Sequence, residues 1–304
     1  MSSMPTGRHR QSPWIATPAS VFVMLLASVT DMSAQGCDRA CLGRLLDAYL
    51  EAVVAHDPSR APLAETFRYT ENAIEMRAGE GLWKTATALG SVQRRYLDPV
   101  SGQAAYFGLI EEGAGSGIAT LRLRVVDRSI TEGELVIGRP SMGVFDREGL
   151  IENPPAAGPV APAARSSRED LLAAAVSYFE GVHTKDGSII RAHPGCPRIE
   201  NGLMLAGRRP GAERQPQFAD CTAGMERNPN IAAVVNRRFP VIDEEAGAVL
   251  GMVVFLRPPN ARRGDGSVLG RNLLTEIFTI EDGRIRSIHA AMHYLDEGVP
   301  APGW

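Results

Sequence analysis

Two stretches decide the fold: DAYLEAVVAHDPSRAPLAETFRYTEN at residues 47–72 and VSYFEGVHTKDGSIIRAHPGCPRIEN at residues 176–201. Five residues of the first stretch recur in the second at a constant offset of 129 residues, Tyr49, Glu51, Asp57, Glu71 and Asn72 becoming Tyr178, Glu180, Asp186, Glu200 and Asn201. Five ungapped identities with matching hydrophobic positions indicate a duplicated unit. The Pro- and Ala-rich segment 152–167 between the copies is typical of an extended linker.

The repeat divides a chain of 304 residues into parts. Residues 1–34 have basic residues followed by the apolar run SVFVMLLASV (20–29) and small residues at Ser33 and Ala34, which is the pattern of a signal peptide. The first module is then expected over 35–151 and the second over 168–304. The apolar run is shorter than the roughly 20 residues that span a bilayer. We therefore expect an exported protein, periplasmic or secreted, with no membrane attachment after the leader is removed.

The composition excludes several classes of protein. Hydrophobic residues make up 44% and charged residues 22%, as in globular domains. The net charge is −3, and the basic residues are scattered, so nothing suggests nucleic acid as a partner. Four cysteines would remain after cleavage of the leader, and an even number in an oxidising compartment favours two disulfides. Local pairs Cys37–Cys41 and Cys196–Cys221 would give one bridge to each module.

The order of predicted elements is helices first and strands later, which gives an α+β class. Apolar periodicity predicts an amphipathic helix at the start of each copy, over 42–53 and 171–179. In the first copy a second helix is expected over 59–67 and a third over 81–97. Period-two alternation predicts strands, in an antiparallel meander, at 104–112, 117–127 and 130–138 and at 248–257, 273–282 and 284–295. Residues 202–239 match no element clearly.

These patterns resemble the nuclear transport factor 2-like, or SnoaL-like, fold. The resemblance rests on a helix ending in Tyr-x-x-Ala-x-x-x-x-Asp (Gly181 replaces the Ala in the second copy), on YTEN (69–72), and on the predicted third helix and long strands. The C-x-x-x-C-L opening at 37–42 is similar to an exported branch of that superfamily. The resemblance implies two cone-shaped modules, each with three helices packed on a curved antiparallel sheet around a pocket.

Members of this superfamily that resemble ketosteroid isomerase perform cofactor-free chemistry in that pocket. In them a Tyr eight residues before the Asp of the first helix donates a hydrogen bond to an oxyanion, which matches Tyr49 and Tyr178. The family's Asp base lies where this chain has Glu-Asn, so the base would be Glu71 or Glu200, displaced by one position. That shift turns a strand side chain to the other face, which leaves steroid isomerisation itself in question.

Other candidates belong to the second copy. His289 could act as an acid or base, His193 is a further histidine of this copy, and Arg271 could stabilise an anion. On a strand His289 and His293 would lie about 13 Å apart, too far to share one metal ion. No pattern calls for a metal or a cofactor. Glu276 lies on the same predicted strand as Arg271, with Glu134 as its approximate counterpart, and alternation does not say which faces the pocket.

Structural roles compete with each of these assignments. The tyrosines could be core aromatics, the Glu-Asn pairs turn or capping residues, and His289 a satisfied strand histidine. The repeated Asp57 and Asp186 suit caps at helix ends.

The leading hypothesis is an exported, cofactor-independent lyase or isomerase acting on a small apolar or aromatic organic substrate, with the second copy active. The alternative is a non-catalytic ligand-binding or dimerisation protein of the same fold. Its two copies would pair as a pseudo-dimer with a sheet-to-sheet contact and blocked pockets, and a homodimer is also possible. A third hypothesis divides the work, with a structural first copy and a ligand-binding second copy.

Overall fold

The computed structural model describes residues 36–113, 115–209, 215–262, 266, 268–296, 298 and 299. They belong to one compact unit. The predicted leader lies outside these residues. None of the helices in the described part of the chain is long and apolar enough to cross a membrane.

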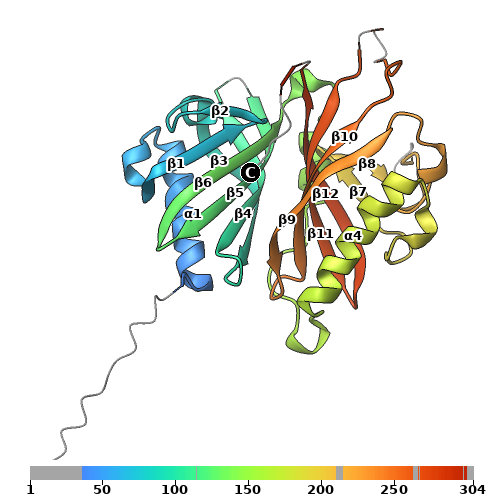
Figure 1. The fold of residues 1–304 in the computed structure, drawn as a ribbon, viewed down its shortest axis with the longest axis horizontal. Coiled ribbons are helices and arrows are strands. Elements are labelled where there is room, and N and C mark those ends of the chain that lie inside the picture. Colours follow the sequence, from blue (N-terminus) through green and yellow to red (C-terminus); the bar gives the residue numbers. More distant parts are fainter. Residues whose placement is uncertain are drawn as a thin grey trace, which may run out of the picture. The chain divides into compact units, whose positions relative to one another are not determined.

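Two six-stranded sheets make up most of the structure (Figure 1). The first has the order β2-β1-β6-β5-β4-β3 and the second the order β8-β7-β12-β11-β10-β9. The strands of the first sheet are β1 (Leu63–Glu71), β2 (Ile74–Met76), β3 (Ala86–Asp98), β4 (Gln103–Glu112), β5 (Gly115–Val126) and β6 (Ser129–Gly138). Those of the second are β7 (Arg198–Glu200), β8 (Leu203–Ala206), β9 (Ala233–Asp243), β10 (Ala248–Leu256), β11 (Arg271–Glu281) and β12 (Arg284–Leu295). The two orders correspond strand by strand, so each sheet defines one module.

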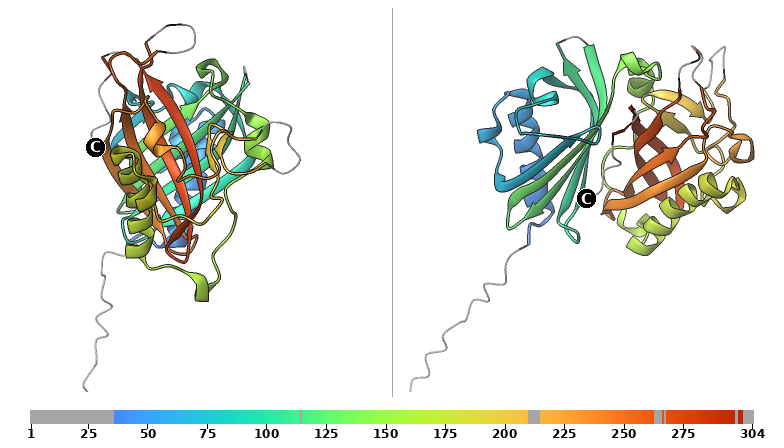
Figure 2. Two further views of the ribbon diagram at one scale, coloured as in Figure 1. Left: turned by 90° about the vertical axis from the view of Figure 1, so that its right-hand side faces the viewer. Right: turned by 45° about the horizontal axis from the view of Figure 1, so that its top comes forward.

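One long helix packs on each sheet. Helix α1 (Arg39–Val54) begins at Asp38, whose carboxylate accepts a hydrogen bond from the Cys41 amide, and α4 (Arg168–Thr184) begins at Ser167. Figure 2 shows α4 crossing one face of its sheet. The remaining α-helices of the described residues are short: α2 (Leu82–Thr85) and α3 (Arg147–Glu152).

The α+β class and the six predicted strands are confirmed, but two predicted helices are wrong. Residues 59–67 form a three-residue 3₁₀ turn and then β1, and residues 81–97 form α2 and then β3. Both strands carry register shifts, β1 against β6 and β3 against β4. Such irregularities break the period-two alternation and leave apolar residues at helix-like spacings. Each module therefore has one long helix rather than three.

The expectation of a purely antiparallel sheet is also corrected. β1 pairs in parallel with β6, and β7 pairs in parallel with β12, so both sheets are mixed. In each module the chain leaves the long helix, forms the first strand, and reaches its parallel neighbour only after four further strands. The long crossover is what a parallel pair requires.

The repeated Asn residues tie these parallel strands together. Asn72 and Asn201 both have left-handed backbone conformations, with φ of 51° and 44°, which Asn tolerates better than most residues. The Asn72 side chain accepts from the Ile137 amide and donates to the Ile137 carbonyl, at 2.9 and 3.2 Å. Asn201 makes the same pair with Met292, at 2.9 and 3.0 Å. Their recurrence therefore reflects the architecture of the sheets.

The repeated Asp residues are caps. Asp57 and Asp186 each begin a 3₁₀ turn after the long helix and accept a hydrogen bond from a serine amide two residues later, at 3.0 and 2.9 Å. The capping interpretation of these residues is confirmed.

An apolar core joins the two sheets. It contains residues of both modules, among them Phe107, Leu109, Leu250, Met252 and Ile277, all at most 1% exposed. At its centre the Thr275 hydroxyl donates to the Thr120 hydroxyl at 2.8 Å. These two residues hold matching positions on β11 and β5, so equivalent parts of the two modules meet there, as they would across a pseudo-two-fold axis.

Asp98, at the end of β3, is fully buried against the second module. Its carboxylate accepts two hydrogen bonds from Arg168, at 2.9 and 2.7 Å, and one from the Ile242 amide at 3.0 Å. The amides of Val100 and Ser101 also donate to it. Burial alone would raise the pKa of Asp98, but the hydrogen bonds from Arg168 and these amides hold it below the usual range.

Asp243, at the end of β9, makes the reciprocal set of contacts. It is fully buried and accepts from Arg39 at 2.7 and 3.0 Å and from the Leu97 amide at 2.8 Å. Arg39 precedes the first repeat as Arg168 precedes the second, by the same offset of 129 residues. The two modules are therefore held by two copies of one interaction, each crossing from one module to the other.

Both predicted disulfides are present: Cys37 is bonded to Cys41 and Cys196 to Cys221. Two disulfides are typical of proteins in an oxidising, extracytoplasmic environment.

The buried carboxylates allow a test of the interface. We expect Asp98→Asn to lower the free energy of unfolding by roughly 2–4 kcal/mol, because it leaves Arg168 without its charged partner. Urea unfolding at pH 7 would measure this. Glu226→Gln, which removes a surface ion pair with Arg227, is the control and should leave stability nearly unchanged.

The same variant should change the response to acid. Because the folded-state pKa of Asp98 lies below its unfolded value near 3.8, the stability it contributes is present above about pH 4 and is lost as the pH falls through the lower folded value. Asp98→Asn should therefore lose less stability than the wild type between pH 4 and pH 2. Equal losses would contradict this role of Asp98.

Candidate functional site

The second module contains a cavity of about 220 Å³ between α4, the concave side of its sheet and the loop that follows β8. It is smaller than the roughly 300–1,000 Å³ typical of sites for drug-sized ligands. Helix α4 contributes Tyr178 and Val182, β7 contributes Arg198 and Glu200, and the loop contributes Phe218. The sequence forms this wall because residues two apart on a strand, such as Arg198 and Glu200, share one face.

Tyr178, Arg198 and Glu200 meet at one end of the cavity. Arg198 Nε lies 3.2 Å from Glu200 Oε1, and Arg198 Nη1 donates to the Tyr178 hydroxyl at 3.4 Å. The guanidinium also stacks on Phe218, 5.6 Å from the ring centroid. Burial raises the pKa of Tyr178, which the nearby Arg198 opposes only in part, so the phenol stays neutral and can donate a hydrogen bond.

Glu276 lies behind this group. It occupies one row across the sheet with Ala290 and Glu200, and its other neighbour, on β10, is Gly251. Its side chain is fully buried, and neither carboxyl oxygen has a hydrogen-bond partner among the described residues. Burial, and then repulsion from Glu200, raise the pKa of Glu276 well above that of an ordinary carboxyl. Glu276 therefore favours its protonated form, while Glu200 is paired with Arg198.

The other end of the cavity has Arg257 and Asn272. Arg257 donates to the Asn230 carbonyl at 2.8 Å, but among the described residues neither its Nε nor the Asn272 side-chain oxygen has a partner. Asn272 is 3% exposed. Buried polar atoms are rarely left without partners, so these groups point to a polar ligand.

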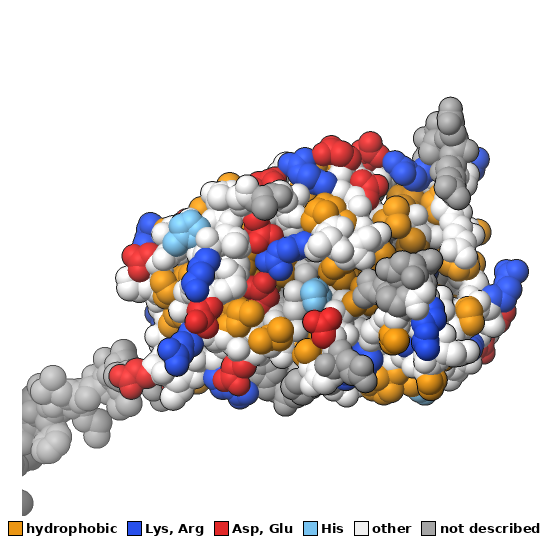
Figure 3. Space-filling view, turned by 90° about the horizontal axis from the view of Figure 1, so that it is seen from above, with side chains coloured by type: hydrophobic (Ala, Val, Ile, Leu, Met, Phe, Trp, Pro, Cys, Tyr) orange, Lys and Arg blue, Asp and Glu red, His pale blue; other side chains and the backbone are white. Residues whose placement is uncertain are grey.

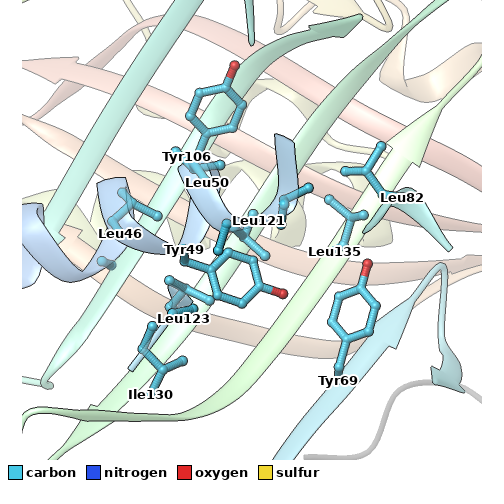
Figure 4. Packing of buried hydrophobic residues seen from close by; sticks show 14 of the residues in the cluster. Leu46, Tyr49, Leu50, Tyr69, Leu82, Tyr106, Leu121, Leu123, Ile130 and Leu135 are labelled. Atoms are coloured by element: carbon cyan, nitrogen blue, oxygen red, sulfur yellow. The ribbon is translucent and has the colours of Figure 1, made fainter. Parts of the chain in front are cut away.

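The corresponding space in the first module is filled (Figure 4). Leucines and tyrosines surround Tyr49, and only about 10 Å³ remains among them. Trp83 of α2 packs edge-on against the Tyr49 ring at 5.0 Å. Tyr49 is 1% exposed, and burial raises the pKa of its hydroxyl, which in the described part of the chain has no partner beyond the neighbouring indole.

Glu71 performs a structural task in this filled module. Its carboxylate accepts from the Leu82 amide at 2.7 Å and from the Tyr69 hydroxyl at 3.3 Å, and it pairs with Arg139 at 3.0 Å. These contacts hold the start of α2 against β1.

Three predicted residues of the second module lie elsewhere. His289 packs against Phe107 of the first module and its Nε2 lies 3.0 Å from the Asn153 carbonyl oxygen; burial lowers its pKa to about 4. It is therefore on the face of β12 that meets the other sheet. Arg271 donates to the Val299 carbonyl, and His193 lies beside the Glu281 carbonyl. The structure brings together Tyr178 and Glu200 and leaves His289, Arg271 and His193 outside the cavity.

The sequence did not identify the partners of Tyr178 and Glu200. Arg198 could have been found from alternation with Glu200 on a short strand. The proposed counterpart of Glu276 was wrong: Leu121 holds its position in the first sheet, as the rows Glu71–Leu135–Leu121 and Glu200–Ala290–Glu276 show. Glu134 instead pairs with Arg238 across the interface, at 2.6 Å.

The described residues contain no cluster of three or more His, Cys, Asp or Glu side chains that could hold a metal ion. On the face in Figure 3, acidic and basic side chains are interspersed rather than gathered by sign.

One protein-family model and several solved structures are similar to this chain. The model described as a domain of unknown function (DUF8021) matches residues 164–292. No curated protein matches. Similar solved structures include a protein from Sphaerobacter thermophilus with 18% identity, covering 41% of this chain and 96% of that one with a TM-score of 0.29.

Two others are described as NTF2-like proteins of unknown function. The one from Cytophaga hutchinsonii has 14% identity, covers 42% of this chain and 90% of its own, and has a TM-score of 0.26. The one from Burkholderia xenovorans has 13% identity, corresponding coverages of 45% and 90%, and a TM-score of 0.29.

The buried carboxyl of Glu276 makes stability depend on pH in a defined direction. Its folded pKa is raised, so the unfolded chain releases the proton first, and stability falls as the pH rises from about 4.5 toward the folded value. Glu276→Gln removes this dependence, and its stability relative to wild type should rise by up to about 1.4 kcal/mol per pH unit within that window.

Urea unfolding at pH 4, 6 and 8 measures the difference. Glu281→Gln, at the half-exposed end of the same strand, is the matched control. A constant difference between Glu276→Gln and wild type at all three pH values would show that Glu276 is ionised in the folded protein.

Proposed function

We propose that the protein is an exported pair of NTF2-like modules in which the second module binds a small organic molecule and acts on it by acid–base chemistry without a cofactor. The observation that carries this proposal is the contrast between the modules. At matching positions the first has Tyr69 and Leu121 where the second has Arg198 and Glu276. Around Tyr178 the second module keeps an open polar cavity beneath its long helix, whereas the space around Tyr49 in the first module is nearly filled. The first module instead has a pocket at the ends of its strands, lined by Glu112 and Arg139.

The roles follow from the contacts. Tyr178 is a neutral phenol at the cavity wall and would donate a hydrogen bond to an oxygen that gains negative charge. Glu200 lines the cavity as a carboxylate and would remove or return a proton. Glu276 is not among the residues that line the cavity, and it acts on Arg198 and Glu200 through its electrostatic effect alone. Two carboxyl groups held in different protonation states are a recurrent arrangement in acid–base sites.

The reaction class is proton abstraction leading to isomerisation or elimination, so the enzyme would be an isomerase or a lyase. The polar lining favours a polar substrate over the apolar or aromatic one suggested by the family resemblance. The first module would then have a structural role, because it provides half of the sheet-to-sheet core and its own cup is filled.

Proton abstraction can be detected before the substrate is known. Small ketones, aldehydes and hydroxy acids would be incubated with the protein in D₂O, and deuterium incorporation at carbon followed by proton NMR. We expect exchange with at least one compound class without any added cofactor. Tyr178→Phe should slow it by roughly 10²-fold, since the hydroxyl would stabilise charge only in the transition state.

Tyr49→Phe is the matched control, because Tyr49 holds the same helix position in the filled module. It should leave the exchange rate unchanged. Equal effects of the two substitutions would exclude the second cavity as the site, and absence of exchange across the panel would contradict the acid–base proposal.

A further inference from the structure

The charges that line the second cavity are unbalanced. Arg198, Arg227 and Arg257 face it, and Glu200 is the only carboxylate among its lining residues in the described part of the chain. Arg198 is paired with Glu200 and Arg227 with Glu226. Arg257 has no carboxylate within ion-pair distance among the described residues.

Arg257 is also partly withdrawn from water. Burial lowers its pKa, and nearby Tyr294 and Glu200 oppose this only in part, which is the signature of a guanidinium that has lost solvent without gaining a full counter-charge. Such a charge is costly unless a partner supplies the opposite sign. A ligand in the cavity is the available source of that partner.

In the first module the residue at the position equivalent to Arg257 is charged and has an ion-pair partner. Arg257 lies two residues beyond Phe255, and Glu112 lies two residues beyond Ile110, which has the same pairing position in its sheet. Glu112 pairs with Arg139 at 2.7 Å, so charge is balanced within the protein there. In the second module the residue at this position, Arg257, has no ion-pair partner among the described residues and lines the cavity.

We propose that the ligand of the second cavity is a small carboxylic acid in its anionic form, with Arg257 as the residue that selects the carboxylate. This rests on the proposed function of the same cavity. Arginine presents a planar fork that suits a carboxylate, and Arg257 is positioned on the wall that also contains Asn272. The side-chain oxygen of Asn272, which has no partner among the described residues, is able to accept a hydrogen bond from a ligand, which favours an acid that also has a hydroxyl group.

Matched acid and amide probes test this. Lactate, succinate and 4-hydroxybenzoate would be titrated calorimetrically into the full chain at pH 7 and compared with lactamide, succinamide and 4-hydroxybenzamide. We expect at least one acid to bind and its amide to bind at least about tenfold more weakly. Arg257→Met should weaken the acid by at least about tenfold as well, with the far-ultraviolet spectrum and thermal unfolding confirming that the variant is folded.

Arg286→Met is the control, because Arg286 pairs with Glu281 and does not line the cavity. It should leave the affinity for the acid unchanged. Equal binding by wild type and Arg257→Met, or binding by none of the acids, would overturn the carboxylate assignment. If Tyr178-dependent deuterium exchange occurred on neutral compounds alone, the carboxylate assignment would be overturned and the proposed function would stand. If neither acid binding nor deuterium exchange were observed, both the assignment and the proposed function would be overturned.

Discussion

The interaction on which the architecture depends is the crossed pair of buried aspartates at the interface between the sheets. Asp98 and Asp243 each satisfy an arginine and a strand amide of the opposite module, and both carboxylates are fully buried. A buried charge that lost its partners would be strongly destabilising, so these contacts fix the relative register of β3 and β9. With that register set, the outer faces of the strands close into one apolar core around Thr120 and Thr275. Each sheet is then covered on one side by the other sheet, and the cavity of the second module lies on the opposite side, beneath the long helix.

The two modules have the same strand order but place different side chains on the side of the sheet beneath the long helix. The first fills it with aromatic and aliphatic side chains, which gain free energy from burial in proportion to their area. The second places Arg198, Glu276 and Asn272 there, groups whose burial costs free energy unless they are paired. Gly251 and Ala290 flank Glu276 in the sheet, and the missing side chain of Gly251 lets the Phe179 ring pack there, since a Cβ would lie 2.6 Å from it. Burial of polar groups lowers the stability of the second module. Because a tight interface joins the two modules, the apolar core of the first offsets this loss.

How much of this could be predicted from the sequence depends on which contacts are local. The long helices, the six later strands, the disulfides and the capping role of Asp57 follow from neighbouring residues, and all were predicted correctly. The helices expected over 59–67 and 81–97 failed because bulges in β1 and β3 changed the spacing of apolar residues. The face of a strand that lines a cavity depends on pairing between strands distant in the chain. That is why His289 was expected in the site and lies at the interface, and why Glu276 was matched to the wrong residue.

Residues 202–239, which match no element clearly in the sequence, include the loop after β8. The irregular structure of this loop has a physical explanation. The loop after β8 contributes Phe218, Met225 and Asn230 to the cavity, and the bond between Cys196 and Cys221 ties it to the start of β7. Regular strands would pair their own backbone groups, whereas an irregular segment turns side chains and carbonyls toward a cavity, as the Asn230 carbonyl does toward Arg257. Its Pro, Gly and Arg content therefore matches a rim that shapes and charges the cavity. The first module, which lacks an equivalent loop of this length between its second and third strands, closes the same space with α2. The different connection, together with the different side chains at matching strand positions, accounts for an open cavity beneath the helix of one module and a filled core in the other.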